Sequence, residues 1–301
     1  MAQFSPGARL RQALAEEKPL QMVGAINAYA ALLAEQAGFR ALYLSGAGVA
    51  NASFGLPDLA MTTATELAEE VRRITGASSL PLLVDADTGF GPALSIARTV
   101  KELTRAGAAG LHLEDQVQAK RCGHRPGKEL VSAAEMQDRV AAACHARPDP
   151  DFVIVARTDA YAVEGLEAAI ARAQSYVEAG ADWIFAEALG SLSDYQTFVK
   201  QVPVPILANL TEFGKTPLLP TEALAEVGVG VALYPLSAFR AMAKAAQKVY
   251  WEIRTQGTQA GLVDEMQTRS ELYQTIGYYN YERQIDELLK KESKWQTKAQ
   301  D

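Results

Sequence analysis

The stretch Ala106-Gly107-Ala108-Ala109-Gly110-Leu111-His112-Leu113-Glu114 contains the pattern that decides the fold. A glycine follows a helix-like segment, a short apolar run comes next, and an acidic residue stands at the end of that run. Glycine closes a helix in the left-handed conformation at little cost. A short apolar run without alternation is typical of a parallel strand buried on both faces. The stretch therefore predicts a helix end, a tight turn and a buried strand.

The same pattern recurs along the chain. Glycines precede a strand-like run at Gly38, Gly107, Gly180 and Gly228. The apolar runs lie at residues 22–25, 41–44, 82–84, 110–113, 152–156, 183–186, 205–208 and 228–234. Eight such runs alternating with helices predict a (β/α)8 TIM-type barrel, read here as a single domain over residues 1–301 without a linker.

Helical sequence continues beyond the eighth strand. Residues 238–256 and 272–291 each read as a helix, and the second contains Tyr278, Tyr279 and Tyr281. We therefore expect a C-terminal helical extension over about 238–301. Exposed aromatic residues favour an interface between subunits, and packing within one chain is the alternative.

Composition limits the function classes. The 29 basic and 36 acidic residues give a net charge of -7, which offers no footprint for nucleic acid or an anionic membrane. Two cysteines cannot form a disulfide framework. No apolar run reaches the roughly 18 residues of a membrane span, and residues 1–6 lack a secretory signal pattern. A cytoplasmic enzyme is the expectation.

Two carboxylates stand at alternate positions after the third strand. Asp85 and Asp87 share one face of the chain there. Hard oxygen ligands of this kind suit magnesium, which keeps several waters and takes one or two carboxylates. Asp58 and Glu114 could hold those waters from neighbouring loops. The alternative for the pair alone is acids that form a turn at the strand end.

A thiol lies among cations after the fourth strand. Cys122 is surrounded in sequence by Lys120, Arg121 and His124, cations that would stabilise a thiolate. A buried packing cysteine is the alternative. Gly123, with the glycine and proline that follow, indicates a loop able to close over a substrate.

Three arginines lie in or beside apolar sequence: Arg157, Arg240 and Arg269. The guanidinium fork grips carboxylates bidentately, so together they indicate a polycarboxylate ligand. Singly, each could be an ordinary ion-pair residue.

Nucleotide and zinc motifs fail on spacing. The glycines of Gly46-Ala47-Gly48 lack a third at Asn51, and Gly214-Lys215-Thr216 lacks the leading glycine of a P-loop. The histidines and cysteines show no spacing of a structural zinc site.

At this point the chain resembles the isocitrate lyase and phosphoenolpyruvate mutase superfamily, and within it the 2-methylisocitrate lyases, over roughly residues 5–290. The resemblance rests on Tyr43-Leu44-Ser45-Gly46, Leu56-Pro57-Asp58, Val84-Asp85-Ala86-Asp87, Leu113-Glu114-Asp115-Gln116, Lys120 to Arg125, Ala156-Arg157-Thr158-Asp159, Asn209-Leu210-Thr211-Glu212-Phe213 and Tyr234-Pro235-Leu236-Ser237.

The resemblance implies a magnesium ion at Asp85 and Asp87 and terminal helices that exchange between subunits, commonly in a homotetramer. It also implies a set of substrate contacts: Ser45, Gly46, Ala47, Cys122, Gly123, Arg157, Glu187, Asn209, Leu210, Thr211, Arg240 and Arg269. Ala47 is a departure, because the family usually has glycine there. Alanine is tolerable at that position only with φ below zero or with a small strain.

The implied reaction is a retro-aldol cleavage of a small tricarboxylate. Magnesium would lower the proton affinity of the substrate hydroxyl, and Tyr43 would remove its proton. Lys120, Arg121 and His124 would stabilise the enediolate of succinate, and Cys122 would protonate it. The resemblance places this reaction in the methylcitrate cycle of propionate catabolism.

Four other activities stay open at the level of sequence. Isocitrate lyase and 2,3-dimethylmalate lyase act on similar substrates, and a methyl group is worth only about 1 to 3 kcal/mol in a pocket. A phosphonate mutase or hydrolase is more distant, because the cysteine loop indicates carbon-carbon cleavage. A non-enzymatic ligand-binding barrel would need neither Cys122 nor the paired acids.

Overall fold

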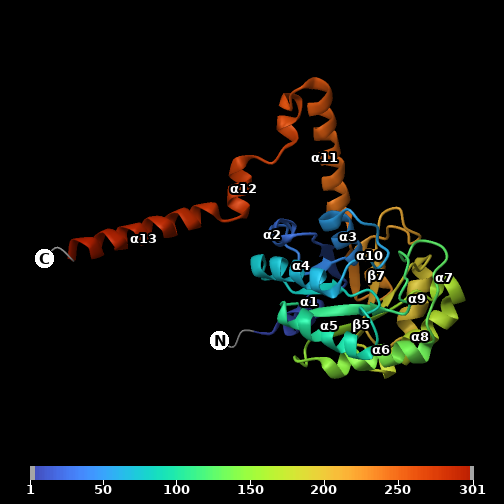
Figure 1. Ribbon diagram of the computed structural model, residues 1–301. Helices are drawn as coiled ribbons and strands as arrows, with labels where there is room; N and C mark the ends of the chain where they lie inside the picture. The colour runs from blue at the N-terminus through green and yellow to red at the C-terminus, as the bar shows by residue number, and fades with distance from the viewer. Residues whose placement is uncertain (1–3, 299–301) are drawn as a thin grey trace. The chain divides into compact units, whose positions relative to one another are not determined.

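The strands close into a parallel barrel in which neighbours along the chain pair in order and the last strand pairs with the first. The structure is a computed structural model that describes residues 4–298, with side chains through residue 290. The strands are β1 (Leu20–Gly24), β2 (Ala41–Leu44), β3 (Leu82–Asp85), β4 (Gly110–Glu114), β5 (Val153–Thr158), β6 (Trp183–Ala186), β7 (Ile206–Asn209) and β8 (Val231–Tyr234). The predicted (β/α)8 barrel is confirmed (Figure 1).

Helices surround these strands. They are α1 (Pro6–Glu16), α2 (Ala28–Gln36), α3 (Gly46–Phe54), α4 (Ala64–Ala77), α5 (Ala93–Arg105), α6 (Ala133–Ala146), α7 (Tyr161–Glu164), α8 (Leu166–Glu178), α9 (Leu192–Gln201) and α10 (Thr221–Glu226). Gly107 follows α5 with φ of 96°, so its conformation is the left-handed one expected from the sequence. The glycines at 38, 180 and 228 also have positive φ.

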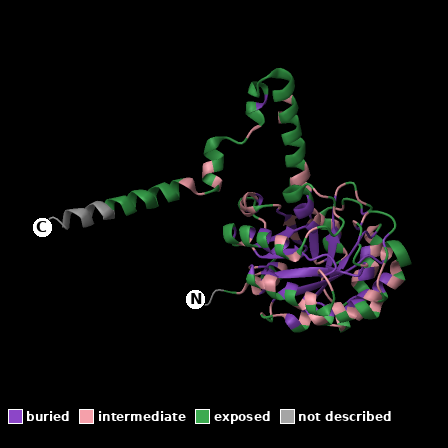
Figure 2. Ribbon diagram, in the orientation of Figure 1, coloured by how far each residue is buried: buried purple, intermediate pink, exposed green. Residues whose placement is uncertain are grey.

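The core has two parts. One lies between the strands and the surrounding helices, and the other fills the inside of the barrel. The inner part includes Leu10 of α1 beside strand residues such as Leu20 and Val153, so α1 covers the end where the strands begin. Figure 2 shows the buried strands within partly exposed helices. The opposite end, where the strands finish, is left for the site.

The C-terminal helices form a second compact unit from Ala243, and the first unit extends to Met242. The C-terminal elements are α11 (Ser237–Gln256), which begins in the first unit, a 3-10 turn (Ala260–Glu265), α12 (Arg269–Thr275) and α13 (Tyr278–Lys298). The expected single helix over 272–291 is wrong, because Gly277, with φ of 67°, separates α12 from α13. A single domain stays a prediction, and its ends at 1–3 and 299–301 lie outside the described residues.

No helix within residues 4–298 is long and apolar enough to span a membrane.

Candidate active site

Polar side chains gather at the carboxyl ends of the barrel strands and are nevertheless buried. The sequence-predicted residues at these ends are Ser45 and Gly46 after β2, Asp85 and Asp87 at β3, Glu114 at β4, Arg157 in β5, Glu187 after β6, and Asn209, Leu210 and Thr211 at β7. Buried polar groups persist where they bind one another or a ligand. This end of the barrel is therefore the candidate site.

Asp85 and Asp87 face the start of α3. The backbone N–H of Gly46 donates to Asp85 Oδ2 at 3.0 Å. A Cβ built at Gly46 would lie 3.2 Å from Asp85 Oδ2 and 3.3 Å from Asp87 Oδ1, so both carboxylates approach the same backbone position. A glycine leaves room for this close approach. The paired arrangement predicted from the sequence is present.

Burial and charge act differently on the two carboxyls. Burial raises the pKa of Asp85, but His112, Lys120 and Arg157 outweigh it and bring that pKa to about 2. For Asp87, burial and the charge of Asp85 together raise the pKa to about 6 against the opposing charge of Lys120. The two carboxylates therefore repel each other, and a bound cation would relieve that repulsion.

A lysine from the cysteine loop forms ion pairs with acids of this group. Lys120 Nζ is 2.7 Å from Asp87 Oδ1 and also pairs with Asp58. Glu114 Oε1 is buried and has no hydrogen-bond partner. No three acidic, histidine or cysteine side chains in the described part of the chain are already grouped as ligands of one ion. Two carboxylates with waters still fit magnesium, and the unpaired Glu114 oxygen could accept from such a water.

Tyr43 lies inside the barrel beside a histidine that the sequence left without a role. Tyr43 Oη is 2.8 Å from His112 Nε2, and the two rings are stacked with an interplanar angle of 5°. The same His112 nitrogen is 3.3 Å from Asp85 Oδ1. Burial, followed by the charge of Asp85, raises the pKa of Tyr43 well above its usual value. The phenol therefore keeps its proton in the free protein.

The cysteine loop is folded back onto the strand ends. The side-chain amide of Gln116 donates to Arg121 O at 2.8 Å and accepts from Arg121 N at 3.0 Å. A Cβ at Gly123 would clash with Glu187 Oε1 and Arg157 Nη2, so only glycine fits there. The loop thus brings Cys122 next to the residues of β5 and β6.

The three cations next to Cys122 in sequence have different surroundings, and their role towards the thiol stays a prediction. Lys120 pairs with acids, His124 Nε2 lies 3.2 Å from Glu187 Oε1, and Arg121 is exposed. Burial raises the pKa of Cys122 above that of a free thiol. The free protein therefore holds a thiol at this position, which is the protonated form that a proton donor needs.

Arg157 and Glu187 are the centre of a second group of contacts. Arg157 donates to Asp159 at 2.9 and 3.2 Å and lies 5.1 Å from the centre of the Phe185 ring. Its Nη2 is 3.5 Å from Glu187 Oε1. Asn209 donates to Glu187 Oε2 at 3.2 Å. The Arg157 guanidinium, with Glu187 and Asn209 fixed beside it, can therefore orient a carboxylate ligand.

His124 has a defined orientation in this group. The backbone N–H of Lys215 donates to His124 Nδ1 at 3.0 Å. Burial lowers the pKa of His124, so the ring is neutral near pH 7. Its proton is then assigned to Nε2, which faces Glu187.

The remaining predicted residues have mixed outcomes. Arg240 donates to the backbone carbonyl of Glu212 at 2.6 Å and to its carboxylate Oε2 at 3.2 Å, and it lies over the Phe213 ring, so protein groups hold it in place. Arg269 begins α12 in the second unit, and its substrate contact stays a prediction. Ala47 lies within α3 and is absent from the described residues with positive φ, so alanine fits there without strain.

Sequence reasoning missed three residues that organise the site. They are His112 beside Tyr43, Asp159 beside Arg157, and Lys128, whose ammonium bonds Gly123 O and Asp159. Asp159 had a usable signal, because it follows β5 in the same way that Asp87 follows β3. Lys128 had none, since a lysine after a glycine usually points to solvent.

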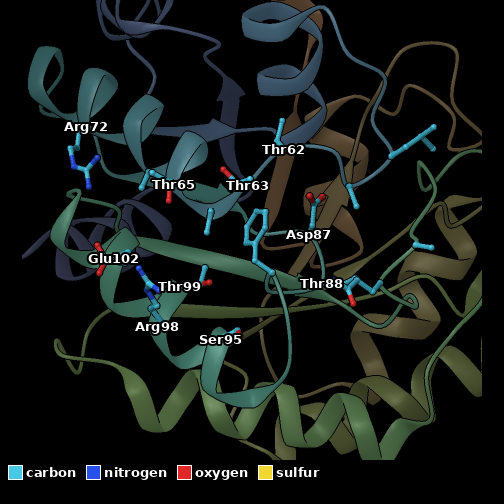
Figure 3. Close-up of a pocket in the computed structure, with 17 residues that line it drawn as sticks. Thr62, Thr63, Thr65, Arg72, Asp87, Thr88, Ser95, Arg98, Thr99 and Glu102 are labelled. Atoms are coloured by element: carbon cyan, nitrogen blue, oxygen red, sulfur yellow. The ribbon is translucent and has the colours of Figure 1, made fainter.

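Two hollows flank the Asp58–Lys120 pair. One of about 640 Å³ is lined by Cys122, Lys120 and Asp58. The other, of about 900 Å³, lies between the 59–65 loop and α5, and Asp87 is the only predicted site residue on its wall (Figure 3). The hollow with the thiol is therefore the one that matches the predicted chemistry.

Comparison with known proteins agrees with this geometry. The sequence model of the family described as phosphoenolpyruvate phosphomutase matches residues 10–254. The 2-methylisocitrate lyase of Escherichia coli is 60% identical over 290 residues, which are 96% of this chain and 98% of that protein.

Solved structures show the same barrel. A 2,3-dimethylmalate lyase has a TM-score of 0.87 at 32% identity, with 95% of this chain and 96% of that chain covered. Phosphonopyruvate hydrolase in complex with oxalate and Mg²⁺ has a TM-score of 0.82 at 32% identity, with 93% and 98% covered.

Proposed function

Because the chain belongs to the phosphoenolpyruvate phosphomutase family, and within it groups with the 2-methylisocitrate lyases, we propose that it cleaves 2-methylisocitrate to pyruvate and succinate. The observation that carries the proposal is the position of the cysteine loop, whose Gly123 lies close against Arg157 and Glu187 and whose Cys122 lines the hollow of about 640 Å³. Carbon-carbon cleavage needs a proton donor at the new carbanion, and the half-buried Cys122 thiol supplies one. We place the reaction in the methylcitrate cycle of propionate catabolism.

Asp85 and Asp87 are the proposed direct ligands of magnesium, with Asp58 and Glu114 acting through waters. The unpartnered Glu114 Oε1 and the raised pKa of Asp87 support this assignment. When bound, magnesium supplies positive charge that lowers the proton affinity of the substrate hydroxyl. Lys120, which contacts Asp58 and Asp87, then becomes available to a substrate carboxylate.

Tyr43 is the proposed acceptor of the hydroxyl proton. Burial makes its phenolate costly in the free protein, so the phenol must first pass its own proton to the neutral His112 ring 2.8 Å away, and the phenolate formed there is a strong base. The stacked His112, 2.8 Å from Tyr43 Oη, fixes the direction of the phenol. The bond to the neighbouring carbon then breaks, and the enediolate of succinate forms beside the cysteine loop.

Cys122 is the proposed general acid for that enediolate. Its pKa is raised by burial, so the thiol is protonated at neutral pH and ready to donate. Arg157, with Arg121 and Lys120, supplies positive charge for the dianion and for the thiolate left after transfer, and the neutral His124 ring supplies an N–H donor. The remaining proposed substrate contacts are Ser45, Gly46, Ala47, Gly123, Glu187, Asn209, Leu210, Thr211, Arg240 and Arg269.

The substrate assignment is tested by product analysis. The protein with magnesium is incubated separately with 2-methylisocitrate, isocitrate and 2,3-dimethylmalate, and products are followed by proton NMR. We expect pyruvate and succinate to form from 2-methylisocitrate at least about tenfold faster than any cleavage of isocitrate, which is the scale of one methyl group in a pocket. Preference for another substrate would keep the chemistry and refute the assignment. Cleavage of none would favour the phosphonate branch.

We also propose that the protein is a homotetramer whose C-terminal helices exchange between subunits. The proposal rests on the exposed apolar residues of the second unit. Leu262 is its only buried large apolar residue among residues 243–290, whereas Trp251, Tyr281, Leu288 and Leu289 are each more than half exposed. Apolar surface of this extent favours cover by another chain. Light scattering is expected to give four times the mass of one chain, and Leu288→Glu a smaller species, with Glu287→Gln as control. A monomeric wild-type protein would contradict the proposal.

A cytoplasmic location is part of the same proposal. Cys122 and Cys144 are both free thiols, and the reaction needs Cys122 reduced. Reducing compartments keep thiols in that state.

A further inference from the structure

Lys128 carries a buried positive charge that the proposed mechanism does not use. Its side chain is 1% exposed. The ammonium donates to Gly123 O and to Asp159 Oδ1, both at 2.7 Å. A buried charge is costly unless it is paired and hydrogen-bonded, and both conditions are met here by groups of the candidate site.

The two partners of Lys128 belong to different parts of that site. Gly123 is the residue after Cys122, and its peptide lies directly on Glu187 and Arg157. Asp159 also accepts two hydrogen bonds from Arg157, and its backbone N–H donates to Asp115 Oδ1 at 2.9 Å. Lys128 therefore joins the cysteine loop to the end of β5.

We propose that Lys128 is a positioning residue that holds the half-buried Cys122 thiol in place by anchoring the neighbouring Gly123, which lies close against Arg157. It reaches the thiol through the neighbouring Gly123 carbonyl and does not touch the substrate. Without the ammonium, the Gly123 carbonyl loses its donor and Asp159 keeps only Arg157 as a charged partner. The loop is then released from β5, and the thiol becomes more exposed and easier to ionise.

The test measures thiol reactivity in the absence of substrate. In a Cys144→Ser background, only Cys122 can react with iodoacetamide. Lys128→Met is expected to raise the alkylation rate by about tenfold or more, the scale of one lost charge-assisted hydrogen bond. Lys101→Met, an exposed lysine of α5, is the matched control and should leave the rate unchanged.

Turnover and thermal unfolding are measured on the same variants. We expect Lys128→Met to lower kcat more than it changes KM, because the acid is displaced while the proposed substrate contacts outside the cysteine loop remain. A folded Lys128→Met protein whose alkylation rate equals that of the Cys144→Ser parent would overturn the proposal, even with a lower Tm, since a purely structural role predicts that result. If this variant does not fold, Lys128→Gln keeps a neutral donor and should give an intermediate increase.

The kcat measurement rests on the proposed function, whereas the measurement of the Cys122 alkylation rate does not. Faster alkylation in a protein that cleaves no 2-methylisocitrate would support the role of Lys128 and reject only the substrate.

Discussion

Asp87→Ala is expected to lower turnover by on the order of a thousandfold or more and to remove its dependence on magnesium, because a catalytic metal contributes several kcal/mol to the transition state. Asp87 is 5% exposed, and its carboxylate and that of Asp85 both lie close to Gly46, the first residue of α3. Removing it leaves Asp85 as the only proposed direct ligand. Activity is measured by pyruvate formation with and without magnesium.

The backbone at Asp87 calls for a second variant. Its φ is 48°, a left-handed conformation that alanine adopts with strain and asparagine tolerates. Asp87→Asn keeps the shape and removes the charge, so it should show the same loss with a nearly unchanged Tm. Binding of Mn²⁺, followed by electron paramagnetic resonance, should weaken in both variants. Asp138→Ala removes an exposed carboxylate of α6 and serves as control. Wild-type turnover that persists in excess chelator would disprove the metal site.

The barrel could be predicted from sequence because its signals are local and repeated. Four helix ends, such as Ala106-Gly107, close with a left-handed glycine, and the strands are short and largely apolar, such as β6 (Trp183–Ala186), which is buried throughout. The carboxyl ends of parallel strands must meet at one end of a barrel. The grouping of Asp85, Glu114 and Arg157 follows from that topology alone.

The partners of the charged residues could not be predicted in the same way. Lys120, Arg121 and His124 are close in sequence, yet their side chains have different surroundings, because a loop has no fixed side-chain periodicity. Gly277 lies inside the helix predicted over 272–291, and its left-handed conformation separates α12 from α13 instead. Arg240 lies on Glu212, a contact that depends on how the β7 and β8 ends approach.

Cys122→Ser is expected to lower kcat by on the order of a thousandfold or more while KM changes little. Serine preserves the size of the side chain, and the Gly123 backbone that seats the loop is untouched. A hydroxyl is a far weaker acid than a thiol, however, so protonation of the enediolate slows. The raised pKa of Cys122 is compatible with this role, because an acid must hold its proton until the carbanion forms.

Cys144→Ser is the matched control for this substitution. Cys144 lies on α6, and its thiol donates to Gly180 O at 3.2 Å, away from the proposed chemistry. Turnover of the control should stay within about twofold of the parent, as expected for a substitution remote from the reacting atoms. A near-parental kcat for Cys122→Ser would remove the thiol from the mechanism. Proton transfer would then have to come from His124, the nearest neutral donor of the same loop, and His124→Gln would show the larger loss.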